Sequence, residues 1–114
     1  MPPSELPLFT HWDTTLKDLL SRTRKFPKSV RHTFANRIED LALDVVERLV
    51  EARWARSKAA ILRAASLDVE KLRILCRLAH DEGFLDHRGY EHVARNLDEA
   101  GRMLGGWIKQ QDAR

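Results

Sequence analysis

The side chains best suited to chemistry gather around one glycine. His80, Asp81, Glu82, Asp86 and His87 flank Gly83. Imidazole and carboxylate groups bind divalent metals, but a metal site needs its ligands at set spacings on regular elements. A carboxylate-bridged site inside a helical bundle needs Glu-x-x-His on two helices, and no such pair occurs. We therefore expect these residues to cap helix ends, with no metal and no cofactor.

Nucleophilic catalysis is not indicated either. The single cysteine, Cys76, lies among apolar residues, where a thiol is usually a small buried hydrophobe. His11, His32 and His92 have no neighbouring Ser or Cys to activate, and no phosphate-binding loop, Gly-x-Ser-x-Gly or dinucleotide fingerprint is present. The sequence predicts a protein that is not an enzyme.

Charge is the stronger functional signal. The chain has 20 Lys and Arg against 17 Asp and Glu, and 14 of the 20 cations are Arg, whose planar guanidinium suits bidentate recognition of phosphate. An acidic block over residues 39–51 separates two basic blocks. The first comprises Arg22, Arg24, Lys25, Lys28, Arg31 and Arg37, and the second comprises Arg53, Arg56, Lys58 and Arg63.

These blocks allow two interpretations. They are solvated helix faces that pair with one another, or they bind nucleic acid. If both basic blocks lie at the same end of a helical hairpin, they form one electropositive surface. A further alternative makes Arg37 a buried partner of Asp98 or Glu99.

The 114 residues fit one domain spanning 1–114, with enough apolar residues for a core. The apolar runs are too short to span a bilayer, and the N-terminus lacks the regions of a secretory signal, so we expect a cytoplasmic protein with no membrane partner.

Apolar residues recur at intervals of three and four, which predicts an all-α protein with four helices at about 8–25, 28–55, 58–82 and 87–110. Short connections favour an antiparallel up-and-down four-helix bundle. Ser57 is the expected N-cap of the third helix, with Ser66 as the alternative. Gly83 is the expected C-cap of that helix, and Asp86 the N-cap of the fourth.

Some residues have no obvious use in a single bundle. Trp54 and Trp107 are expected near helix ends beside basic residues, and Gly105-Gly106 lies inside the fourth helix, where each Gly costs about 1 kcal/mol relative to Ala. A close contact with another helix or another subunit explains the glycines. The alternative is fraying near the C-terminus.

Three stretches resemble a known family. They are Phe26-Pro27-Lys28 with Arg31 and Arg37-Ile38, then Glu70-Lys71-Leu72-Arg73 running into Arg77-Leu78-Ala79, and finally the stretch from Glu99-Ala100-Gly101-Arg102 through Gly105-Gly106-Trp107 to Lys109. Together they resemble the small four-helix-bundle family that includes the accessory variability determinant (Avd) of diversity-generating retroelements and the proteins encoded in bacterial 23S rRNA intervening sequences.

The resemblance implies a homopentameric ring with a basic outer surface. Five copies at a net charge of +3 each carry about +15. The Avd branch implies binding to RNA or DNA and to a reverse transcriptase. The resemblance places Lys28, Arg31 and Arg37 on the basic surface, with Arg22, Arg24 and Lys25 nearby. We expect Arg53, Arg56, Lys58 and Arg63 to bind nucleic acid on the basis of their charge, because they match no motif of the family. The residues expected at oligomer or close helix contacts are Trp54, Gly101, Gly105, Gly106 and Trp107.

Two functions follow from the resemblance. The first is a non-catalytic accessory protein, a basic ring that holds nucleic acid against the polymerase in mutagenic retrohoming. The second is a structural or protein-interaction bundle of the intervening-sequence type, with weak or no nucleic-acid binding.

Overall fold

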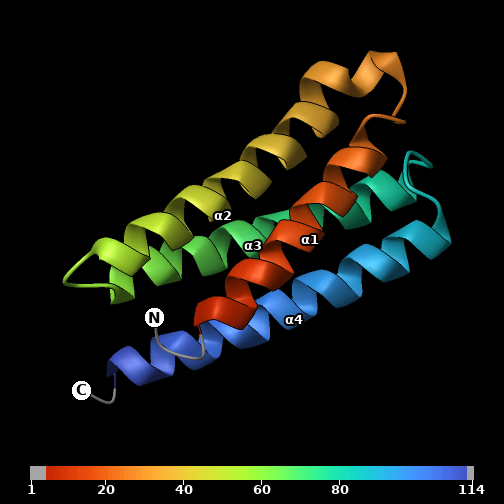
Figure 1. The fold of residues 1–114 in the computed structure, drawn as a ribbon. Coiled ribbons are helices and arrows are strands. Elements are labelled where there is room, and N and C mark those ends of the chain that lie inside the picture. The colour runs from red at the N-terminus through yellow and green to blue at the C-terminus, as the bar shows by residue number, and fades with distance from the viewer. Residues whose placement is uncertain (1–4, 113–114) are drawn as a thin grey trace.

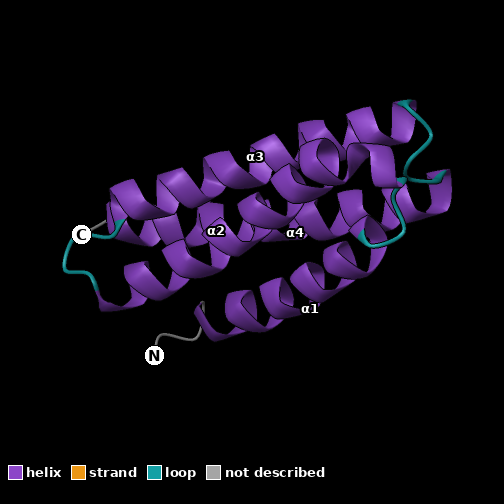
Figure 2. Ribbon diagram, turned by 90° about the horizontal axis from the view of Figure 1, so that it is seen from above, coloured by secondary structure: helices purple, strands orange, loops and turns teal. Residues whose placement is uncertain are grey.

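A computed structural model of the chain describes residues 5–112. They form four α-helices, namely α1 (Glu5–Thr23), α2 (Asn36–Trp54), α3 (Ala59–Asp81) and α4 (His87–Asp112). Residues 5–112 contain no strand (Figure 2). The all-α fold expected from the sequence is confirmed.

The helices form an elongated bundle of 46 × 24 × 19 Å. Each helix packs against two others, α2 on α3, α3 on α4, α4 on α1 and α1 on α2. The α1–α2 and α3–α4 connections lie together at one end of the bundle, and the α2–α3 connection lies at the other (Figure 1). This is the up-and-down arrangement that short connections impose.

The core follows the expected apolar rows. In the third helix, six apolar residues recur at the expected intervals of three and four, and all six are buried; they are Leu62, Ala65, Val69, Leu72, Cys76 and Ala79. Trp12 joins α1 to α2, because its indole Nε1 donates a hydrogen bond to the carbonyl of Ala42 at 3.0 Å while its ring is 1% exposed. Aromatic burial of this kind supplies a large share of the stability of a small bundle.

The expected second helix, 28–55, is wrong at its N-terminal side. Residues Lys28–Val30 form a 3₁₀ turn and Arg31–Ala35 a π-helical turn, and the α-helix begins only at Asn36. Pro27 is extended (φ −54°, ψ 144°) and Val30 has φ −114° and ψ 13°, so the backbone is bent twice before it becomes regular. Helix α1 also differs, beginning three residues earlier than expected and ending at Thr23.

The start of α3 differs from both serine alternatives. Lys58, not Ser57, occupies the N-cap position, and Ser66 lies inside the helix. The Lys58 ammonium instead donates hydrogen bonds to the carbonyls of Ala52, Arg53 and Ala55 at 2.6–3.1 Å, which satisfies the open C-terminus of α2.

The α3–α4 turn is as expected. Gly83 has φ +83°, the left-handed conformation that glycine adopts without strain. The Asp86 carboxylate accepts a hydrogen bond from the backbone N–H of Gly89 at 2.7 Å, as an N-cap does.

One ion pair lies in the seam between α2 and α3. The Asp68 side chain is 4% exposed, and its carboxylate accepts a hydrogen bond from Arg48 Nε at 2.6 Å. This hydrogen bond raises the pKa of Arg48. A buried carboxylate without this partner is costly, so the pair holds α2 and α3 in one register.

Replacing Arg48 with Met leaves the Asp68 carboxylate buried and unpaired. Since Arg48 is partly exposed, we expect a loss of about 2–3 kcal/mol in the free energy of unfolding, measured by urea denaturation. Arg63→Met is the control, because both members of its pair with Asp112 are more than half exposed and such pairs contribute about 0–1 kcal/mol. Equal losses in the two variants would contradict a structural role for the Arg48–Asp68 pair.

Candidate nucleic-acid interface

Five members of the first basic block cluster on and beside the α1–α2 connection. All five are exposed, and within residues 5–112 none of their side chains forms an ion pair or a hydrogen bond; they are Arg24, Lys25, Lys28, Arg31 and Arg37. Exposed cations without protein partners are free to neutralise phosphate. We refer to these five residues as the basic connection.

Local packing holds the backbone of the basic connection in place. Thr23 donates a hydrogen bond to a Glu39 carboxylate oxygen at 2.6 Å, which joins the end of α1 to the first turn of α2. The rings of Phe26 and Phe34 both contact Phe84, with centroids 6.1 and 5.4 Å apart, and so tie the connection to the α3–α4 turn. The cations therefore project from a fixed base.

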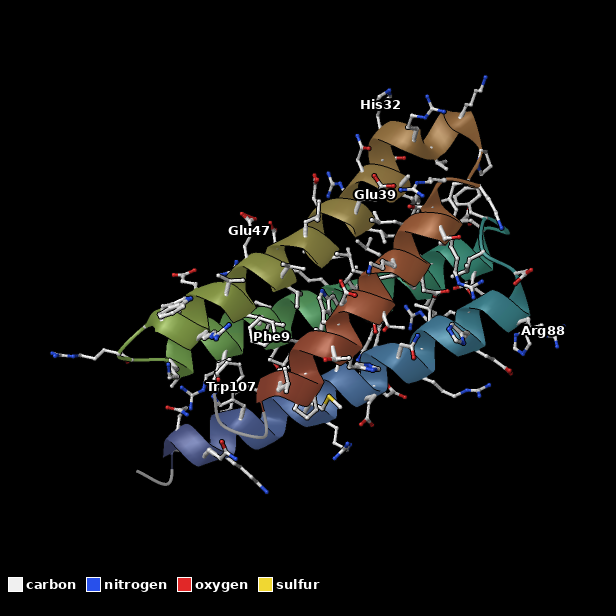
Figure 3. The ribbon with its side chains drawn as sticks, viewed as in Figure 1. Phe9, His32, Glu39, Glu47, Arg88 and Trp107 are labelled. Carbon is white, nitrogen blue, oxygen red and sulfur yellow. The ribbon has the colours of Figure 1, made fainter. Side chains whose placement is uncertain are left out.

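The double bend turns several polar side chains outward. His32, on the π-helical turn, points away from the bundle at the tip of the connection (Figure 3). Arg24 and Arg31 line a shallow cavity of about 290 Å³ beside Glu39. Short π-helical turns are frequent at functional sites, because the wider turn redirects side chains.

Arg22 lies apart from the other cations of its block. Its Nε donates a hydrogen bond to Asp18 at 3.0 Å, and its side chain is 30% exposed. The guanidinium also lies over Gly89, where an added Cβ would be 2.5 Å from Nη1. Arg22 thus joins α1 to the start of α4 and has less freedom to bind phosphate.

The second basic block lies at the opposite end of the bundle. Arg37 lies in the first turn of α2 and Arg53 in its last, so even these nearest members of the two blocks are about 24 Å apart along the helix at 1.5 Å per residue. Within one chain they cannot form one surface, so the hypothesis that placed both blocks at the same end is wrong (Figure 1).

Most cations of the second block already have partners. Lys58 caps α2, Arg63 donates hydrogen bonds to both carboxylate oxygens of Asp112 at 3.0 Å, and Arg53 lies 5.3 Å from the centre of the Trp54 ring. In the described chain, Arg56 is the one member whose side chain has no such contact.

The two tryptophans have different environments. Trp54 is 78% exposed at the end of α2, whereas Trp107 is 1% exposed in the core and points from α4 into the bundle (Figure 3). A single bundle therefore does use Trp107, contrary to the sequence interpretation. Its burial removes it from any surface at which another subunit could bind.

The helical glycines differ in the same way. A Cβ at Gly101 would lie 3.0 Å from Nη2 of Arg73, so Gly101 makes room for a guanidinium that binds Asp98. A Cβ at Gly105 or Gly106 would meet no atom within 4 Å. The close contact expected for Gly105-Gly106 is therefore absent within the described chain.

The ion pairs of Asp98 and Glu99 on α4 test the hypothesis that Arg37 is their buried partner. Asp98 is bound by Arg73 and Glu99 by Arg102, and Arg37 is exposed on α2. The hydrogen bond from Arg102 lowers the pKa of Glu99. Arg37 as a buried partner of Asp98 or Glu99 is therefore wrong, and Arg37 is available at the surface.

The two histidines that flank Gly83 contact neighbouring side chains of the α3–α4 turn and of α4. His87 Nε2 lies 2.8 Å from Glu91, and His80 stacks on Tyr90 with ring centres 4.6 Å apart. Residues 5–112 contain no group of three or more His, Cys, Asp or Glu side chains placed to hold a metal ion.

Cys76 is buried in the core, and burial raises the pKa of its thiol to about 12. Alkylation needs the thiolate. At pH 8 the folded protein should therefore resist iodoacetamide, and alkylation, followed by mass spectrometry, should appear once guanidinium chloride unfolds the chain. Rapid modification of the folded protein would contradict the buried, protonated thiol.

One surface feature was missed in the sequence. Exposed apolar residues lie on α2 and α3, on the side of each helix away from the core; they are Leu43, Val50 and Trp54 on α2, and Leu67, Ile74 and Leu78 on α3. The available signal was their spacing, since they fall outside the expected core rows and repeat at intervals of seven and four.

The fold and this surface define a class, a small up-and-down four-helix bundle with the basic connection at one end and exposed apolar rows on two helices. No helix within the described chain is long and apolar enough to cross a membrane. A family model described as bAvd-like matches residues 11–111, which is most of the chain. The protein belongs to the bAvd-like family. No curated protein matches the chain.

Proposed function

We propose that this protein is a non-catalytic accessory factor of a diversity-generating retroelement, acting in the cytoplasm as an oligomeric basic ring. Membership of the bAvd-like family implies the accessory role. The observation that carries the binding part of the proposal is the basic connection, five exposed cations without protein partners at one end of the bundle. Its ligand is the phosphate backbone of RNA or DNA.

The chemistry of the basic connection favours binding without sequence preference. Arg and Lys side chains contact phosphate oxygens and release condensed counterions, which provides affinity but reads no bases. Trp54 is the one exposed tryptophan of the described chain, and Arg53 lies over its ring, so an extended platform for stacked bases is not built. Binding should follow backbone shape and charge.

The proposed partners are further copies of the chain and a reverse transcriptase. An oligomer carries several basic connections. Once one of them binds a nucleic acid, the others bind the same molecule at a high effective concentration, so the affinity of the oligomer exceeds that of a single copy. A ring of this kind holds template RNA or cDNA near the polymerase. The catalytic chemistry then belongs entirely to the polymerase.

Charge reversal of Arg31 and Arg37 tests the nucleic-acid site. The experiment is a fluorescence-anisotropy titration of the full chain with a structured RNA and with a DNA duplex, at several salt concentrations. The wild type should bind at low salt and weaken steeply as salt rises. Arg31→Glu/Arg37→Glu should bind at least tenfold more weakly. Its slope of log affinity against log salt should fall by about 0.7–0.9 for each lost phosphate contact.

Arg95→Glu/Lys109→Glu is the matched control. It makes the same change in net charge, at exposed positions on α4 that lie outside the basic connection. It should retain most of the affinity, and far-UV circular dichroism should show all proteins folded. Equal loss in both variants would mean that only net charge matters. No binding by the wild type at low salt would overturn the nucleic-acid role and favour a protein-interaction bundle of the intervening-sequence type.

A further inference from the structure

Helices α2 and α3 each expose an apolar row. Of the seven large hydrophobic residues exposed among residues 5–112, six lie on these two helices. The α2 row is Leu43, Val50 and Trp54, which are 45–78% exposed, and the α3 row is Leu67, Ile74 and Leu78, which are 37–56% exposed. Both rows have intervals of seven and four residues, so each lies along one side of its helix. Exposed large apolar residues that gather on two adjacent helices, in place of being scattered singly over the surface, are typical of an interaction site.

The two rows are bordered by opposite charges. The charged residues of α2 near its row are the acids Asp40, Asp44, Glu47 and Glu51, with Arg37 in the first turn and Arg53 over the Trp54 ring. On α3, Arg63 is paired with Asp112 and Glu70 with Arg73, which leaves Lys71 and Arg77. Within the described chain neither Glu47 nor Lys71 has an ion-pair or hydrogen-bond partner. Glu47 points outward from α2, away from the other helices (Figure 3). Among side chains with neither an ion pair nor a hydrogen bond in residues 5–112, acids are in the majority on α2, and the two on α3 are basic. The α2 face is therefore mainly acidic and the α3 face mainly basic.

The Arg48–Asp68 pair sets the height of each row along the bundle. Arg48 and Asp68 lie at the same level, and α2 and α3 are antiparallel. A residue a given number of positions before Arg48 therefore lies level with the residue the same number of positions after Asp68. Leu43 then lies at the level of Ile74, Val50 at the level of Leu67, and Glu47 near Lys71, within about 3 Å at 1.5 Å per residue.

We infer that the α2 face of one copy packs on the α3 face of a second copy of this chain. If two copies are related by a rotation about an axis parallel to the helices, each residue keeps its position along that axis. The α2 row of one copy then meets the α3 row of the next, with Leu43 opposite Ile74 and Val50 opposite Leu67. Apolar residues then face apolar residues, and Glu47 faces Lys71. The charge complementarity selects a second copy as the partner.

The interface joins two different faces, so it is head-to-tail and leads to a ring. In a square bundle the outward directions of adjacent helices differ by about 90°, an angle that closes into a small ring and not into a long filament. The inference rests on the oligomer of the proposed function and assigns the residues that build it. A cavity of about 600 Å³ between α2 and α3 joins Leu67 and Ile74 of the α3 row to Leu41 and Leu75, and its other lining residues are charged; they are Arg37, Asp40, Asp44, Glu70 and Lys71.

The ring geometry also arranges charge. All copies point the same way, so every basic connection lies on one rim, while the acidic α2 faces are covered at the interfaces. A chain with a net charge of only +3 thus presents a strongly positive rim.

Exchange of the paired charges tests the interface. The mass of the full-length protein is measured by size-exclusion chromatography with light scattering. The wild type should be a closed oligomer. Glu47→Lys alone and Lys71→Glu alone should each weaken association at least tenfold, because like charges then face each other at every interface. Glu47→Lys/Lys71→Glu should restore the oligomer.

Apolar substitutions provide a second, independent measurement. Val50→Asp and Leu67→Asp should give folded monomers by circular dichroism. Leu6→Asp is the control, since Leu6 is 60% exposed on α1, outside both rows, and its variant should remain oligomeric. A monomeric wild type would overturn the inference, as would Glu47→Lys and Lys71→Glu variants that keep the wild-type mass.

The failure of this interface can be separated from failure of the proposed nucleic-acid role. A wild-type ring that dissociates as described but does not bind nucleic acid leaves the interface standing and removes the nucleic-acid role. A wild-type monomer that binds nucleic acid does the reverse.

Discussion

The buried Asp68 carboxylate constrains the rest of the molecule. It lies in the seam between α2 and α3, and Arg48 must stay beside it because an unpaired carboxylate there would be costly. That requirement fixes the register of the two helices that carry the exposed apolar rows. The same pair therefore links the stability of one chain to the proposed contact between chains, since a shift of one helix along the other would misalign both rows.

The distribution of charge follows from the length of α2. The first basic block ends in the first turn of this helix, at Arg37, and the second begins in its last turn, at Arg53, so the two lie at opposite ends of the bundle. At the α2–α3 end, Lys58 and Arg63 serve helix capping and an ion pair. At the α1–α2 end, Arg22 is paired with Asp18, but the five cations of the basic connection form no ion pair or hydrogen bond within residues 5–112. Arg and Lys side chains thus stabilise the fold at the α2–α3 end, whereas those of the basic connection are free to bind ligands.

Much of the fold could be predicted because burial requires apolar residues at intervals of three and four. The rows of α3 and the caps at Gly83 and Asp86 are local features, and the structure has them as expected. The double bend before Asn36 depends on Pro27 and on packing against Phe84, which a helical pattern does not reveal. Trp107 follows Leu104 by three residues and so continues the core row, although Ile108 also fits that pattern.

The site was harder to predict than the fold. The expected length of the second helix already implied that the two basic blocks are far apart, and the same-end hypothesis would have needed a much shorter helix. Which cations are free depends on long-range pairs such as Arg63–Asp112, which sequence spacing does not show. The apolar rows were visible as residues outside the core pattern, but their exposure follows only from the position of each helix in the bundle.

The most direct experiment measures whether loss of the oligomer weakens the binding of nucleic acid. The slope of log affinity for a DNA duplex against log salt should be compared between the wild type and Val50→Asn/Leu67→Asn, which disrupts the interface without changing the charge. The account predicts a clearly shallower slope and weaker binding for the monomeric variant, because one basic connection neutralises fewer phosphates than a rim of several. An unchanged slope in a protein shown to be monomeric would contradict it.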